Sequence, residues 1–294
     1  MKARIAILCC TLLWGCSFVV LKDLTVNLPF GIILVVRFLL AAVVLLPVVI
    51  VRRARLFERN CVMGGVIVGL CLFVAYYFQT TGLMQTTPGK NAFITAIYCV
   101  IVPFYIWIFD KKKPSIYTVI ALCCAVVGLG LVSLSGNFSI NVGDALTLVC
   151  AFFFAGQIYF VARYGTDSDL FCFTFWQFLT AGVCFFIYSV IDGEHLDFAS
   201  LSLAQYGALA YLLFGATLAC ILLQNYGQRN LPAASSGLLL TTESVFGAGI
   251  SVALGYEALT APIFCGFCLI FVAMVISEAG PELYLKIKQR FLHA

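Results

Sequence analysis

Charged residues are scarce in this sequence. Asp, Glu, Lys and Arg make up only 10% of its 294 residues, whereas 63% are hydrophobic and the mean hydropathy is +1.08. Ordinary soluble domains carry roughly 25% charged residues. A soluble fold of this length has too little interior to bury so much apolar surface. The shortage of charge therefore excludes a soluble domain and predicts an integral membrane protein surrounded by lipid.

Residues and motifs that carry enzyme chemistry are also few. The sequence has two histidines, His195 and His293, so we expect neither a metal site nor a cofactor. It lacks a Walker phosphate loop, a nucleophile elbow and a zinc-binding helix, which argues against an ATP-driven pump and against an enzyme. The 14 cysteines lie mostly in apolar runs, where free Cys behaves as a small hydrophobe. A secondary carrier of small molecules remains.

Ten apolar segments are long enough to cross a bilayer, which takes about 20 residues in a helix. The loops between them are too short to hold a soluble domain. We therefore predict an all-α polytopic membrane protein with ten transmembrane helices, at residues 4–21, 29–51, 62–80, 89–109, 115–134, 144–163, 172–191, 204–224, 233–254 and 261–278.

Lys and Arg are distributed unevenly between the two sides of these segments. Fourteen of the 17 fall at one side, two fall at the other, and Arg37 lies within a span. Cytoplasmic loops are enriched in Lys and Arg, so both termini are predicted to be cytoplasmic. The expected location is the plasma (inner) membrane of a bacterium. The pattern reports topology and gives no sign of nucleic-acid binding. The basic tail at 281–294 is expected to contact anionic membrane lipid.

The two halves of the sequence can be superimposed. Residues 37–42 align with 177–182 at a shift of 140, residues 79–82 with 224–227 at 145, and residues 102–104 with 243–245 at 141. Each half has five spans, so the halves must run in opposite directions through the membrane. Inverted repeats of this kind build alternating-access carriers with a central site. We expect repeats at 1–136 and 137–280 that rock against each other.

Several motifs together resemble the EamA type of the drug/metabolite transporter superfamily. They are Trp14-Gly15 with Ser17-Phe18 and Lys22, Arg37-Phe38 with Ala41, Tyr77-Phe78-Gln79 to Gly82-Leu83, the 95–103 stretch, and Tyr256 to Thr260 before Gly266. The resemblance implies a ten-helix carrier of two inverted repeats. Members move amino acids, nucleosides, sugars, other metabolites or drugs, mostly outward in bacteria. The family's Glu-Pro-Val in the ninth span reads Glu243-Ser244-Val245 here, which leaves a helix break at that point in question.

Two charged residues lie deep in predicted spans. A charge at mid-depth costs at least about 2.5–3.5 kcal/mol, so Arg37 should face the protein interior or water. It is a candidate for binding a substrate carboxylate or phosphate, or for a structural link to a helix end or to Glu243. Glu243 is a candidate proton carrier, because burial favours the neutral carboxyl, or else a permanently paired group. Proton coupling is therefore left open.

Polar and amphipathic aromatic residues gather in several spans. A substrate cavity needs a few such groups among apolar walls. Each of them also suits a hydrogen bond between helices or an anchor at the membrane surface. The predicted substrate-binding residues, among which Tyr98 and Gln157 are favoured because they lie well inside their spans, are Trp14, Tyr76, Gln79, Thr95, Tyr98, Gln157, Tyr159, Trp176 and Asn225. The glycine pair Gly65 and Gly69, and the set Gly247, Ser251 and Gly255, have the spacing of close helix packing.

Together these patterns predict a secondary transporter that exports small organic metabolites, with amino acids or related solutes favoured. Its cavity is expected between spans 1–4 and 6–9. Spans five and ten should face lipid or a second subunit, which leaves a homodimer open. The alternatives are a flippase for lipid-linked sugars and an integral membrane enzyme. The nearest group to a catalytic cluster is His195 with the acidic residues around it, in a predicted outer loop.

Overall fold

The computed structural model describes residues 1–52, 55–133, 141–231, 236 and 239–292, and all regular structure within these ranges is helical. The helices are α1 (Lys2–Asn27), α2 (Phe30–Val51), α3 (Arg59–Gln85), α4 (Pro88–Thr95), α5 (Tyr98–Asp110), α6 (Ile116–Ser133), α7 (Val142–Tyr164), α8 (Leu170–Ile191), α9 (Leu203–Ala210), α10 (Cys220–Asn230), α12 (Thr242–Ala253) and α13 (Ala261–Leu292), with the short η2 (Phe198–Ser200) and the π-helix η3 (Tyr211–Ala219).

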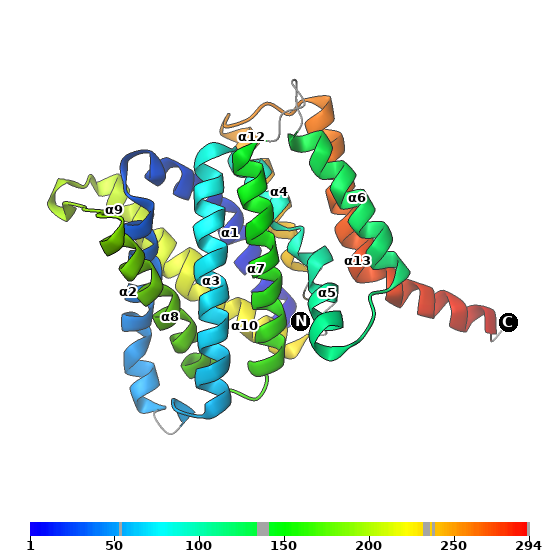
Figure 1. Cartoon of the computed structure of the whole chain (residues 1–294), viewed down its shortest axis with the longest axis horizontal. Helices are drawn as coiled ribbons and strands as arrows, with labels where there is room; N and C mark the ends of the chain where they lie inside the picture. Colours follow the sequence, from blue (N-terminus) through cyan, green and yellow to red (C-terminus); the bar gives the residue numbers. More distant parts are fainter. Residues whose placement is uncertain (53–54, 134–140, 232–235, 237–238, 293–294) are drawn as a thin grey trace.

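The helices confirm a polytopic all-α membrane fold. Among the described residues, seven helical segments are long and apolar enough to span a bilayer, and two shorter apolar helices cover Ile116–Val132 and Ala261–Ser277. The predicted ninth span lies partly outside the described residues, so the count of ten stays a prediction, as does the side of the termini. The predicted basic tail continues α13 to Leu292, and this helix extends beyond the rest of the molecule (Figure 1).

The two halves of the chain are interleaved. The most extensive packing joins α3 to α7, α6 to α13 and α2 to α8, and each of these pairs takes one helix from each half. Packing of α1 against α12 and α10 also crosses between halves. Rocking of 1–136 against 137–280, which stays a prediction, would have to rearrange these contacts.

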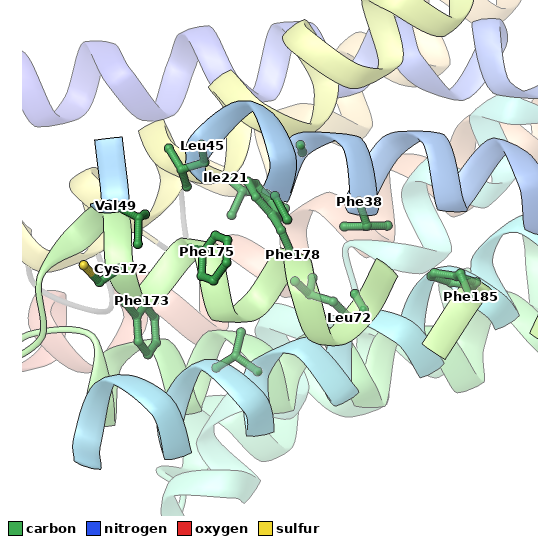
Figure 2. Packing of buried hydrophobic residues seen from close by; sticks show 14 of the residues in the cluster. Phe38, Leu45, Val49, Leu72, Cys172, Phe173, Phe175, Phe178, Phe185 and Ile221 are labelled. Carbon is green, nitrogen blue, oxygen red and sulfur yellow. The ribbon is translucent and has the colours of Figure 1, made fainter. Parts of the chain in front are cut away.

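Helices α3 and α8 come close because glycine lines the contact. A Cβ on Gly65 would lie 2.4 Å from the Trp176 Cβ, and one on Gly69 would lie 2.6 Å from the Thr180 Cβ. The predicted packing role of this glycine pair is confirmed. Beside it, Phe38 and Phe185 stack with ring centroids 5.8 Å apart, within an apolar cluster that α2, α3, α8 and α10 share (Figure 2). This cluster packs helices from the two halves of the chain against each other.

Within the described residues, three of the predicted spans are interrupted near their middles. The fourth span breaks between α4 and α5, where the N–H groups of Ile97 and Val100 bond to carbonyls only three residues back. The eighth span contains the π-helix η3, and the ninth has a turn at Thr241 before α12 begins. Irregular backbone at membrane depth is tolerated only where protein or a cavity surrounds it. The interruptions therefore mark the region where a site is expected.

Candidate functional site

A narrow cavity lies among the interrupted helices. All the residues that line it are buried or half-buried, so the cavity is largely closed from the surroundings. Its lining is Trp14, Ser17, Phe18, Leu21, Arg37, Leu72, Tyr76, Gln79, Thr95, Tyr98, Phe154, Gln157, Ile158, Gln224 and Glu243. In the described part of the chain, α6, α8 and α13 contribute no lining residue.

The π-helix η3 orients two of the lining residues. The indole Nε1 of Trp14 donates to the Ala216 carbonyl at 2.8 Å, and the guanidinium Nε of Arg37 donates to the Thr217 hydroxyl at 2.9 Å. A π-helical turn widens the backbone and changes which groups face a neighbouring helix. Here that local shape supplies acceptors from the eighth span to side chains of the first and second spans.

Arg37 is enclosed, with 1% of its surface exposed. Its guanidinium carbon lies 4.8 Å from the ring centre of Tyr76 and 5.9 Å from that of Phe38, as in cation–π contacts. Its Nη2 is buried and has no hydrogen-bond partner. The only ion pairs among the described residues are Arg52 with Asp169 and Arg163 with Asp110, so Arg37 forms none with Glu243. The predicted structural link between the two is not present.

Glu243 lies in the first turn of α12, with 4% of its surface exposed. The N-terminal end of a helix carries positive partial charge, which favours a carboxylate there. The hydroxyl of Tyr98 faces this carboxyl but makes no hydrogen bond of normal geometry. The turn at Thr241 that positions Glu243 forms although Ser244 replaces the family's proline, with the Ser244 N–H donating to the Thr241 carbonyl at 3.1 Å.

Both halves of the sequence contribute matching positions to the cavity. Residues 14, 17 and 18 of α1 and residues 154, 157 and 158 of α7 all line it, at the shift of 140 found in the sequence. Gln79 and Gln224, 145 positions apart, line it as well. The two charged residues have no charged counterpart in the other repeat. Gln177 occupies the position that corresponds to Arg37, and Val102 or Pro103 occupies the position that corresponds to Glu243.

Comparison with known proteins also divides the chain into two similar halves. The sequence model of the EamA-like transporter family matches residues 1–134 and again residues 141–278. The chain belongs to this family. It is 30% identical over 271 residues to an uncharacterized transporter of Archaeoglobus fulgidus, a match that covers 90% of this chain and 82% of that protein. The likeness to the uncharacterized inner membrane transporter YedA of Escherichia coli K12 is 25% over 279 residues, covering 93% and 89%.

The fold of this EamA-like transporter also matches a solved crystal structure. The TM-score is 0.69 at 13% sequence identity, and the match covers 93% of this chain and 95% of the other. At that identity the likeness shows the fold alone. Together the comparisons and the apolar helices establish a multi-pass membrane transporter. They leave the cargo and the direction of transport to be argued from the site.

Six of the nine predicted substrate-binding residues of this EamA-like transporter line the cavity: Trp14, Tyr76, Gln79, Thr95, Tyr98 and Gln157. Arg37 and Glu243 line it too. The structure brings these residues together from the first, second, third, fourth, sixth and ninth spans. Whether they bind substrate stays a prediction, for which shared position around one cavity is the structural basis.

The other three predicted residues lie elsewhere. Asn225 points toward α8, where its Nδ2 donates to the Thr174 hydroxyl at 2.9 Å. Tyr159 donates to Asp110 at 2.8 Å and accepts from Arg163, at the predicted cytoplasmic ends of α5 and α7. Trp176 donates from Nε1 to the Leu56 carbonyl at 2.9 Å. In this conformation each of them ties two segments together.

Gln224 and the apolar lining residues were not among the predicted cavity residues. Gln224 lines the cavity, and its side-chain amide lies 3.4–3.5 Å from that of Gln157. Its sequence signal was present, because Gln79 was selected and Gln224 is its repeat partner. No comparable signal distinguishes Phe154 or Leu72 from other apolar residues in their helices.

Polar contacts join the helices at both ends of the molecule. At the predicted outer end, the Glu194 carboxylate accepts from the Gly31 and Ile32 N–H groups at the start of α2, at 3.1 and 2.9 Å. The Lys22 ammonium donates to the carbonyls of Leu83, Met84 and Thr86 at the end of α3.

At the predicted cytoplasmic end, Asp169 caps α8 and pairs with Arg52 at 2.7 Å. Partial burial raises the pKa of the Asp169 carboxyl, but hydrogen bonds from the Cys172 N–H and Arg52 outweigh it and hold the pKa below its usual value.

Proposed function

We propose that this EamA-like transporter is a secondary carrier that exports small organic metabolites, with amino acids and related zwitterions as its cargo. The observation that carries the proposal is that a guanidinium and a carboxyl group line the same cavity. Arg37 and Glu243 both line it without pairing to each other. A zwitterion presents one group to each of them, while the aromatic walls accept its side chain.

Transport by this route requires alternating access. The contacts at the two ends of the helices are the candidates for groups that open in turn to release a cargo. Because the halves of the chain are interleaved, this motion would have to rearrange the packing of α3 on α7 and of α1 on α10 and α12. Interruptions in the fourth, eighth and ninth spans supply the local flexibility that such motion needs.

Glu243 is the candidate for proton coupling. Among the described residues it is the only carboxyl that lines the cavity, and it faces the Tyr98 hydroxyl. A carboxyl that binds a substrate ammonium in one state and a proton in the other links export of the solute to entry of a proton. Glu243→Gln keeps the shape but removes the charge, so it should lose the response to a pH gradient.

The test is uptake of radiolabelled amino acids, nucleosides and sugars into proteoliposomes, with and without a pH gradient. We expect one or more amino acids to accumulate, to compete with their own unlabelled forms, and to fail in Tyr98→Ala. Transport of a sugar or nucleoside with no amino acid would contradict the cargo class. No movement of any solute by folded, oriented protein would contradict the small-solute carrier and favour a lipid-linked substrate.

A further inference from the structure

We propose that Arg37 is the carboxylate site of the cavity, and that the transported solute supplies the counter-ion which the protein itself withholds. This inference rests on the proposed function and adds the chemical group that cargo must carry. It predicts that binding and transport of a solute depend on its carboxylate more than on its ammonium group.

The contacts that hold the Arg37 guanidinium leave part of it free. Its Nε is fixed by the Thr217 hydroxyl, and its flat face is covered by the Tyr76 ring. These contacts use one donor and the π face. They leave the Nη2 atom buried at the cavity without an acceptor. Guanidinium groups bind carboxylates through such N–H edges, and the bond is charge-assisted.

Arg37 has no counter-ion among the described residues. A buried charge in a protein is normally paired, because an isolated one is costly. No carboxylate lies within ion-pairing distance of Arg37 in the described residues, and the contacts it does have are a neutral hydroxyl and two aromatic rings. A structural arginine that only ties helices together would satisfy its donors internally. The free Nη2 therefore points to a partner that arrives and leaves.

The internal repeat has a neutral residue at the position that corresponds to Arg37. Gln177 occupies the position related to Arg37 by the shift of 140, and it does not line the cavity. The second repeat thus folds with a neutral amide at this place in its helix. The charge at position 37 is not needed to build the repeat, and Arg37→Gln substitutes a side chain that the equivalent position already holds.

The test compares matched ligands that share one side chain. L-Leucine carries both charges, L-leucinol lacks the carboxylate, and 4-methylpentanoate lacks the ammonium. Binding is measured as thermal stabilisation of the purified protein and as competition against labelled leucine. We expect leucinol to bind at least about tenfold more weakly than leucine, and 4-methylpentanoate to bind better than leucinol. Phenylalanine with phenylalaninol and 3-phenylpropionate forms a second trio for a larger pocket.

Arg37→Gln should weaken leucine binding at least about tenfold and abolish the preference for leucine over leucinol. Thr217→Val is the control for a merely structural role: it removes the hydrogen bond to Nε but keeps the charge, so it should lower thermal stability while the preference for leucine persists. Equal binding of leucine and leucinol by the unmodified protein would overturn the proposal. So would an Arg37→Gln protein that still prefers leucine.

The binding readout separates this proposal from the proposed function. If carboxylates stabilise the protein in an Arg37-dependent manner but nothing is transported, the carboxylate site stands and the carrier function fails. If the cargo is a sugar, glucose and glucuronate replace the leucine pair. Preference for glucose over glucuronate would then overturn the carboxylate site while leaving a carrier.

Discussion

Gly247 and Gly249 lie two residues apart on α12 but have opposite surroundings. A Cβ on Gly247 would lie 2.7 Å from the Ala92 Cβ of α4, whereas a Cβ on Gly249 would meet nothing within 4 Å. The first glycine allows two helices to approach, and the second faces outward from the fold. This pair separates the effect of helix packing from the effect of helix propensity.

We expect Gly247→Ala to lower the free energy of unfolding by about 1–3 kcal/mol, the usual cost of overpacking. Gly249→Ala should be neutral or stabilise by about 0.5–1 kcal/mol, because alanine loses less backbone freedom on folding. Thermal unfolding in detergent measures both. Equal losses in the two variants would show that α12 does not pack on α4 as described.

At the same scale, residue type and depth in a span predicted much of the cavity. Arg37 and Glu243 were selected because charge at mid-depth is costly, and both line it. Tyr159 and Trp176 were selected on chemistry alone, but their polar atoms bond near the helix ends. The third member of the predicted small-residue set, Gly255, has a φ of 78° and nothing near it, so it serves a turn and its predicted packing role is wrong. Sequence spacing does not reveal where a helix ends.

Among the elements, the start of α8 depends on Asp169. Its carboxylate accepts from the Phe171 and Cys172 N–H groups and also pairs with Arg52, whose side chain is 47% exposed. We expect Asp169→Ala to cost about 1 kcal/mol through loss of the cap. Asp169→Asn keeps a capping oxygen and should cost less, since a half-exposed ion pair contributes at most about 1 kcal/mol.

The lowered pKa of Asp169 fixes the sign of its pH dependence. Ionised Asp169 stabilises the fold at pH values above its unfolded pKa of about 3.9, and this stabilisation disappears as the pH falls through the lower folded pKa. Melting temperature measured from pH 6 to pH 3 should therefore fall more steeply in the unmodified protein than in Asp169→Asn. Parallel curves would contradict the ionic role of this cap.

The start of α2 has a different anchor, which comes from the other half of the chain. Glu194 accepts from two N–H groups of α2 and from the Ser189 hydroxyl at 3.0 Å. Glu194→Gln should lower the melting temperature, because hydrogen bonds to a charged group contribute about 1.5–3 kcal/mol. Asp197→Asn is the matched control, since Asp197 caps only the exposed η2. An equal effect of both substitutions would refute the anchor.

The helices themselves were predictable from runs of apolar residues, but their interruptions were not. The fourth span contains no glycine or proline at Ala96–Ile97, where α4 and α5 separate, and nothing in the segment 211–219 signals a π-helix. Tertiary contacts such as the Trp14 bond to Ala216 stabilise these irregular turns. Such contacts arise between segments about 200 positions apart and leave no local pattern.

For the whole molecule, the ten-span topology remains to be measured. The positive-side bias predicts that Lys112 faces the cytoplasm and His195 faces the outside. In a variant without native cysteines, a reporter cysteine at 195 should react with an impermeant thiol reagent in intact cells, and one at 112 only after lysis. The reverse labelling would contradict the predicted orientation.

The repeat was visible in the sequence, but the way the halves combine was not. Matching positions such as 14 and 154 predicted a shared architecture, and the cavity contains both. The expectation that the halves rock against each other stays a prediction, and it must accommodate the packing between α3 and α7 and between α6 and α13, which crosses from one half to the other. Sequence similarity between segments does not indicate which of them are neighbours.

The most direct test of the cavity as the transport site compares two Tyr→Phe variants. Tyr98 lines the cavity and its hydroxyl makes no normal hydrogen bond, whereas Tyr159 lies outside it and bonds to Asp110 and Arg163. Counterflow of a labelled amino acid into proteoliposomes is measured for each. We predict that Tyr98→Phe raises the half-saturating concentration at least about threefold with unchanged stability, and that Tyr159→Phe transports like the unmodified protein. Normal transport by Tyr98→Phe together with a raised half-saturating concentration in Tyr159→Phe would contradict the central cavity as the path of the solute.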